Sequence, residues 1–295
     1  MSLWQCAEGG TVLAEILILY TGGTIGMVPG PEGLHPGAGV LETALATLTP
    51  TGTQTTVETF SPLIDSANIR PADWNHMLDR IAAWQGTAVI IVHGTDTMAY
   101  TGAALSAALA TPRLPVILCG AMAPLNTGGD AEANLSLALA SAQTAPPGVW
   151  LAFAGKLLPG AGLVKQDSHS ADAFRSTAQT PQPAAAARFA PRRLAILSLS
   201  PGLPAPALAA ALAELDGAVL RVFGAGTMMQ DPALIAALRN ATAAGCRLRA
   251  VSQCENGGLM PAAYAAGAAL WSAGVENGGH ETAELALARL WLSLS

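Results

Sequence analysis

Two short, wholly apolar runs that each end in a glycine–threonine turn constrain the fold of this chain most. Ile16–Tyr20 reads ILILY and is followed by Thr21–Thr24 (TGGT), whereas Ala88–Val92 reads AVIIV and is followed by His93–Thr97 (HGTDT). Continuous apolar runs of strand length are typical of parallel strands that are buried on both faces. Parallel strands need long crossovers, usually helical, so the chain is predicted to be an α/β protein.

The rest of the chain repeats the alternation of strand and helix patterns. Further strands are predicted at 55–60, 116–118, 150–153, 194–199, 219–223 and 248–252, and helices at 71–84, 98–110, 131–140, 207–215, 232–239 and 281–294. Thr177–Arg193 holds three prolines and no strand pattern, which is typical of a linker. We therefore expect a mostly parallel N-terminal α/β domain over 1–176, a linker over 177–193, and a smaller α/β domain over 194–295.

The low charge of the chain excludes several classes of protein. Charged residues make up 12% and hydrophobic residues 51%, with a formal net charge of −6, whereas soluble domains carry about 25% charged residues. This balance excludes a disordered chain and argues against nucleic-acid binding, which needs a basic patch. No apolar run approaches the ~18 residues of a membrane span, and the N-terminus lacks a signal-peptide layout. The apolar excess predicts surface buried between subunits.

The cysteines suggest a reducing compartment. Cys6, Cys119, Cys246 and Cys254 are too few for a disulfide scaffold and lack CxxC spacing. Cys246 and Cys254 could hold a metal ion, but no histidine or third cysteine lies near them in the sequence. We expect free thiols, no metal site and a cytoplasmic location.

The two polar turns are the candidate reaction site. Ligands of open α/β sheets bind at the carboxyl ends of the strands, where the turns place Thr24, Thr95 and Asp96. A hydroxyl nucleophile is weak until a neighbouring base takes its proton. His93 is one candidate base, although it could instead point into the sheet. The other is Lys165, one of only two lysines beside twelve arginines, which lies in a polar stretch after a Gly/Pro-rich loop. Asp96 could orient that lysine or bind a ligand ammonium.

Each turn alone also has a simpler interpretation. A glycine turn after a strand could hold a phosphate, but neither GxGxxG nor GxxxxGK[ST] occurs. A Thr/Asp cluster could only cap the next helix. The presence of both turns at matching places is more specific than either one.

Both turns also resemble known signature segments. Tyr20–Met27 (YTGGTIGM) and Val92–Met98 (VHGTDTM) are similar to the two signatures of the bacterial-type L-asparaginase/glutaminase family. Leu63–Asn68 (LIDSAN) resembles the substrate loop of its cytoplasmic type I branch. The next family block resembles Gly120–Met122 together with Asp130, Asn134 and Leu135. The segment 165–176 resembles the block that carries the catalytic lysine.

The resemblance implies an amidohydrolase that needs no metal or cofactor. It implies Thr24 as the nucleophile on the side-chain amide of L-asparagine, and Thr95, Asp96 and Lys165 as a second triad. An oxyanion would be held by backbone N–H groups that include that of Thr95. Whether Thr24 or Thr95 attacks first is not decided by spacing.

The resemblance also implies the substrate contacts and the assembly. Asp65 and Ser66 would hold the α-carboxylate and α-amino groups, with Asp96 on the ammonium. The full expected substrate-binding set is Asp65, Ser66, Ala67, Gly23, Gly94 and Ala121. The expected assembly is a homodimer or homotetramer with active sites between subunits.

The sequence departs from the family pattern at three positions. Leu34 stands where a loop tyrosine is usual, with His35 as a possible substitute, and Ala67 and Thr227 stand where polar side chains are usual. These differences motivate an alternative, a weak or inactive relative that binds amino acids. A third possibility is an amidase for another ω-amide such as L-glutamine. A tRNA-linked amide is disfavoured by the acidic charge balance.

Overall fold

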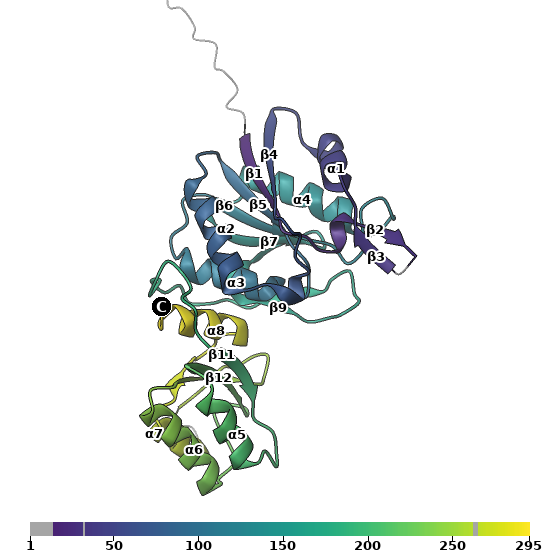
Figure 1. Ribbon diagram of the computed structural model, residues 1–295. Helices are drawn as coiled ribbons and strands as arrows, with labels where there is room; N and C mark the ends of the chain where they lie inside the picture. The colour runs from purple at the N-terminus through teal and green to yellow at the C-terminus, as the bar shows by residue number, and fades with distance from the viewer. Residues whose placement is uncertain (1–13, 32, 262–264) are drawn as a thin grey trace, which may run out of the picture.

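The computed structural model describes residues 14–31, 33–261 and 265–295 (Figure 1). The strands of the larger unit are Ala14–Tyr20 (β1), Met27–Gly30 (β2), Gly33–Pro36 (β3), Thr53–Thr59 (β4), Ala88–Val92 (β5), Pro115–Cys119 (β6), Gly148–Phe153 (β7), Lys156–Pro159 (β8), Leu163–Lys165 (β9) and Phe174–Ser176 (β10). Its α-helices are Val40–Leu48 (α1), Pro71–Ala83 (α2), Met98–Ala108 (α3) and Ala131–Thr144 (α4), and its 3₁₀ turns are Thr24–Gly26 (η1), Ser66–Asn68 (η2) and Gly160–Gly162 (η3).

The smaller unit has the same kind of alternation. Its strands are Leu194–Ser198 (β11), Gly217–Val222 (β12), Arg247–Ser252 (β13) and Glu276–Asn277 (β14). Its helices are Ala205–Ala213 (α5), Pro232–Ala243 (α6), the 3₁₀ turn Ala265–Gly267 (η4), Ala268–Ser272 (α7) and Ala283–Leu292 (α8).

The larger sheet has the order β4-β1-β5-β6-β7-β8 and the smaller one β11-β12-β13-β14. Every neighbouring pair in these two sheets is parallel except β7 and β8. The predicted fold class, a mostly parallel sheet with a second, smaller α/β unit, is therefore confirmed.

The apolar side chains of β1 show why helices cover both faces of the larger sheet. Alternate side chains of this strand point to opposite faces, as the pleat of a strand requires. Leu17 and Leu19 pack with α2 and α3, whereas Ile16 and Ile18 pack with α1 and α4, and all four are fully buried. A strand apolar on both faces is stable only between two helical layers.

Helix α8 joins the two units (Figure 1). Leu285 and Leu292 belong to the core that includes α3 of the larger unit. Ala286 and Leu290, on another face of the helix, pack with β12 and β13 of the smaller sheet. Helices α5, α6 and α7 cover the opposite face of that sheet. One helix is thus shared by two cores, which fixes the smaller unit against the larger one.

The structure contains elements that the sequence patterns did not predict. Helix α1 begins after Gly39, which has a left-handed conformation (φ 72°). A glycine has no side chain to cap a helix, so the start of α1 had no clear signal in the sequence. The hairpin of β2 and β3 and the short strands β9 and β10 are also additional. None of the helices in the described residues combines the length and the apolar character that a membrane crossing requires.

The strand order creates a switch point between β1 and β5. The chain leaves β1 toward β4, on one side, and leaves β5 toward β6, on the other. The register pairs Tyr20 with Val92, so the turns that follow both strands begin side by side. Ligands of open α/β sheets bind in the crevice at such a point.

Candidate active site

Three loops meet at the switch point in contacts that only glycine permits. Gly23 has a φ of 96°, and a Cβ built on it would lie 2.6 Å from the Cα of Gly94. A Cβ on Gly94 would lie 2.6 Å from the Oγ of Ser66. The turn that carries Thr24, the turn that carries Thr95 and the loop that carries Ser66 are therefore packed against one another. This close approach explains why both positions are occupied by glycine.

Lys165 contacts two of the predicted site residues. Its Nζ donates a hydrogen bond to Thr95 Oγ1 at 3.0 Å and forms an ion pair with Asp96 Oδ1 at 2.6 Å. Thr95 is buried, and the side chain of Lys165 is 17% exposed, whereas that of Asp96 is 69% exposed. The three side chains form a connected hydroxyl–amine–carboxylate group, although Thr95 and Lys165 are 70 residues apart in the chain.

A small residue on α3 lets Lys165 reach this position. Strand β9 ends at Lys165 and pairs with Phe174 of β10. A Cβ on Gly102 of α3 would lie 2.8 Å from the Leu163 side chain and 2.9 Å from the Gly160 carbonyl. Because Gly102 has no side chain, the β9 segment lies close to α3, which begins at Met98, two residues after Asp96.

The expected substrate loop is held by local hydrogen bonds. Asp65 Oδ1 accepts from the Ala67 N–H at 3.0 Å, and the carbonyl of Ser66 accepts from Thr97 Oγ1 at 2.7 Å. Ser66 is buried, whereas Asp65 and Ala67 are exposed. Thr97 therefore ties this loop to the turn that carries Thr95 and Asp96.

Ala121 lies on the loop that follows β6, next to these turns. A Cβ on Gly120 would lie 2.4 Å from the His93 carbonyl, so the end of β6 is in close contact with the end of β5. Ala121 itself is 2% exposed. All the expected substrate-binding residues thus lie on loops at the carboxyl ends of the strands, next to the switch point.

His93 points into the protein. Its Nδ1–H donates to the Gly94 carbonyl at 2.7 Å, and its Nε2 accepts from Thr101 Oγ1 at 3.0 Å. The Thr101 hydroxyl in turn accepts from Trp74 Nε1 at 3.0 Å. Complete burial lowers the pKa of His93 to about 4, against the smaller opposing effects of Gly94 and Asp73. His93 is therefore a neutral side chain that holds the loop, and Lys165 is the base candidate that reaches a threonine.

Thr24 lies at the start of η1 and is partly exposed. Among the described residues, no hydrogen bond joins its hydroxyl to Thr95, Asp96 or Lys165, and its link to them is the backbone contact of the glycines. The β2–β3 hairpin follows this turn and carries Leu34, which is 49% exposed.

His35, the possible substitute for the loop tyrosine, and Thr227, another departure from the family pattern, make only local contacts. His35 on β3 is exposed, and its Nδ1 lies 3.2 Å from the Pro36 carbonyl. The Thr227 hydroxyl lies in the turn after β12 and donates to the Phe223 carbonyl at 3.4 Å.

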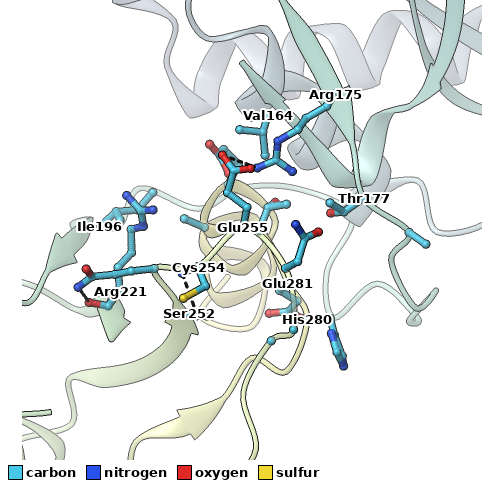
Figure 2. A pocket seen from close by; sticks show the side chains of 18 of the residues that line it. Val164, Arg175, Thr177, Ile196, Arg221, Ser252, Cys254, Glu255, His280 and Glu281 are labelled. Atoms are coloured by element: carbon cyan, nitrogen blue, oxygen red, sulfur yellow. Dashed lines mark hydrogen bonds and ion pairs between the residues drawn. The ribbon is translucent and has the colours of Figure 1, made fainter. Parts of the chain in front are cut away.

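A cavity of about 460 Å³ lies between the two units and reaches Lys165 (Figure 2). Arg175 of β10 points toward Glu255 of the smaller unit, with 3.5 Å between its Nη2 and the carboxylate. Arg221 of β12 and Glu284 of α8 also line it. Burial raises the pKa of Glu284, against the opposing effect of its neighbouring arginines.

Sequence patterns missed several residues that shape the site. Asp130 and Asn134 hold the loop after β6, and the sequence indicated them only as part of a segment that resembles a family block, without a role. Thr101 and Trp74 orient His93 from helices whose periodicity indicates only packing. The described residues contain no cluster of three or more His, Cys, Asp or Glu side chains that could hold a metal ion.

Comparison with known proteins agrees with this architecture. Residues 15–189 match the family model of the asparaginase N-terminal domain, and residues 193–295 match that of the glutaminase/asparaginase C-terminal domain. L-asparaginase 1 of Escherichia coli K12 is 32% identical, over 95% of this chain and 92% of the relative.

Solved structures of asparaginases superpose along nearly the whole chain. The thermostable L-asparaginase of Thermococcus kodakarensis has a TM-score of 0.82 at 28% identity, and L-asparaginase I of Vibrio cholerae has 0.78 at 30%. Each comparison covers 95% of this chain and 92% of the other. The resemblance inferred from the two signature turns is confirmed, and the chain belongs to the asparaginase family.

Proposed function

We propose that this chain hydrolyses the side-chain amide of L-asparagine to L-aspartate and ammonia, with Thr24 as the nucleophile. The observation that carries the proposal is the contact of Lys165 with Thr95 and Asp96, at 3.0 and 2.6 Å, beside the turn of Thr24. The relatives from Escherichia coli and Thermococcus kodakarensis, at 32% and 30% identity, are named L-asparaginase 1 and L-asparaginase, which supports the same substrate class.

The chemistry proceeds in two steps. Thr24 Oγ1 attacks the amide carbon, and the oxyanion that forms is held by backbone N–H groups that include that of Thr95. The C–N bond then breaks, ammonia leaves with the proton of the hydroxyl, and an ester to Thr24 remains. Water attacks the ester, aspartate is released, and Thr24 regains its proton.

Lys165 and Thr95 form the proton path of this scheme. An amine that has lost its proton accepts one from the Thr95 hydroxyl or from an attacking water, and an arginine could not do this at neutral pH. Asp96 holds the ammonium form of Lys165 and lies where it can also bind the α-ammonium of the substrate. Asp65 and Ser66 complete the recognition of the α-groups, as the family resemblance implies.

Ammonia release from L-asparagine and L-glutamine by the purified protein tests the proposal. Turnover of L-asparagine supports it. Faster turnover of L-glutamine favours a second candidate function, an amidase that prefers L-glutamine. The exposed Ala67 motivates this candidate, because its side chain adds no polar contact to the substrate loop. If L-aspartate raises the melting temperature but no amide is turned over, the protein is a binding relative instead.

The assembly and the location remain part of the proposal. We expect a homodimer or homotetramer, because 51% of the residues are hydrophobic and only 12% are charged. A cytoplasmic location is supported by the free thiols of Cys119, Cys246 and Cys254. The division at 1–176, 177–193 and 194–295 is proposed for the functional domains.

A further inference from the structure

The loop that follows β6, residues 120–125, touches both threonine turns. At one end, Gly120 lies against the carbonyl of His93, the first residue of the turn that carries Thr95. At the other end, the Leu125 N–H donates to the Ile25 carbonyl at 3.0 Å, one residue after Thr24. A shift of this loop would therefore reach both hydroxyls.

Asp130 holds the loop from the start of α4. Its carboxylate accepts from the Met122 N–H at 2.9 and 3.1 Å and from the Ala123 N–H at 2.9 Å. An aspartate at the start of a helix usually accepts from the N–H groups of its own helix. Asp130 makes no such capping bond, so its side chain is committed to the loop.

Asn134, one turn further along α4, completes the clamp. Its Nδ2 donates to Asp130 Oδ2 and to the Gly120 carbonyl, both at 3.0 Å, and its Oδ1 accepts from the Ala154 N–H at 2.9 Å. Asn134 is 1% exposed. The amide thus fixes the carboxylate and the first residue of the loop at once.

We propose that Asp130, oriented by Asn134, is a positioning residue for the reaction. It contacts no reacting atom, and it acts by holding loop 120–125 against the turns of Thr24 and Thr95. The kinetic part of this inference rests on the proposed function. Ala121 is the one expected substrate-binding residue on this loop, whereas the groups expected to bind the α-substituents, on Asp65, Ser66 and Asp96, lie on other loops. Loss of the clamp therefore lowers kcat more than it raises KM.

The test is Asp130→Asn, which keeps the size of the side chain and places an amide donor among the N–H groups. We expect kcat for L-asparagine to fall about tenfold and KM to change less than about threefold. The matched control is Glu132→Gln, because Glu132 accepts from the Asn126 N–H in the same connection but outside 120–125. It should leave kcat within about twofold of wild type.

Two readouts separate positioning from general destabilisation. The first readout is hydrogen exchange of the Leu125 N–H, which bonds to the turn of Thr24 and should exchange faster in Asp130→Asn. The second is the melting temperature, which should not change. Asp130→Glu is the second variant if Asp130→Asn does not fold, with the same expected direction.

Unchanged kcat or unchanged exchange at Leu125 in a folded variant overturns the inference. If the wild-type protein releases no ammonia, the proposed function fails, and the exchange rate at Leu125 still decides whether Asp130 holds the loop.

Discussion

Burial of His93 makes a quantitative prediction about acid stability. The pKa of this side chain falls from 6.5 to about 4 because burial disfavours its charged form. The neutral ring fits its partners, since Nδ1–H donates to the Gly94 carbonyl and Nε2 accepts from Thr101. Protonation of Nε2 would place a second donor against that hydroxyl, which is already an acceptor from Trp74.

The sign follows from proton binding. Between pH 6.5 and pH 4 the unfolded chain binds a proton at this histidine and the folded chain does not, so stability falls as the pH falls. At ~1.36 kcal/mol per pKa unit, the whole shift is worth about 3.4 kcal/mol. Lowering the pH from 7.5 to 5 removes about 2 kcal/mol of that amount.

Urea unfolding of the wild type and of His93→Gln at both pH values measures this effect. Glutamine does not titrate, and the other ionisable groups contribute equally to both proteins. The free energy of unfolding of the wild type should therefore fall by about 2 kcal/mol more than that of the variant. Parallel changes in the two proteins would refute the assignment of His93 as a buried neutral side chain.

Further predictions concern activity and stability. Lys165→Met should abolish ammonia release with little change in melting temperature, whereas Lys156→Met, at an exposed ion pair, should leave turnover nearly unchanged; equal losses would contradict the role given to Lys165. Gly94→Ala should raise KM for L-asparagine about tenfold, because its Cβ would lie 2.6 Å from Ser66 Oγ; an unchanged KM would mean that the loop yields freely. Glu281→Gln should lower the free energy of unfolding by about 3 kcal/mol in denaturant titrations, because this 5% exposed carboxylate accepts from two arginines.

Strands buried on both faces were predicted best from the sequence. The run Ala88–Val92 has the predicted bounds, since a wholly apolar run flanked by polar residues leaves little choice of ends. Helix α2 ends one residue before the predicted Trp84, because the start at Pro71 and the apolar period agree. Helix α4 runs four residues beyond the predicted end at 140, where the apolar spacing fades but the backbone bonds continue.

Contacts between side chains that lie far apart in the sequence could not be predicted in the same way. The sequence indicated a lysine near the threonines, but the contact of Lys165 with Thr95 depends on β9 lying against Gly102. His93 could have been a base or a buried group, and only its bond to Thr101 decides between them. Asp130 was indicated by its resemblance to a family block, but its role as a clamp could not be predicted, because both of its N–H partners lie in a loop without a periodic pattern.

The most direct test of the central claim is the rate of ammonia release from L-asparagine by Thr24→Ala. Thr24 is partly exposed, and its removal should not disturb folding. If Thr24 supplies the attacking hydroxyl, the rate should fall about a thousandfold or more, and Thr24→Ser should keep part of it. A rate equal to that of the wild type would contradict the role of Thr24 and point to Thr95 as the nucleophile.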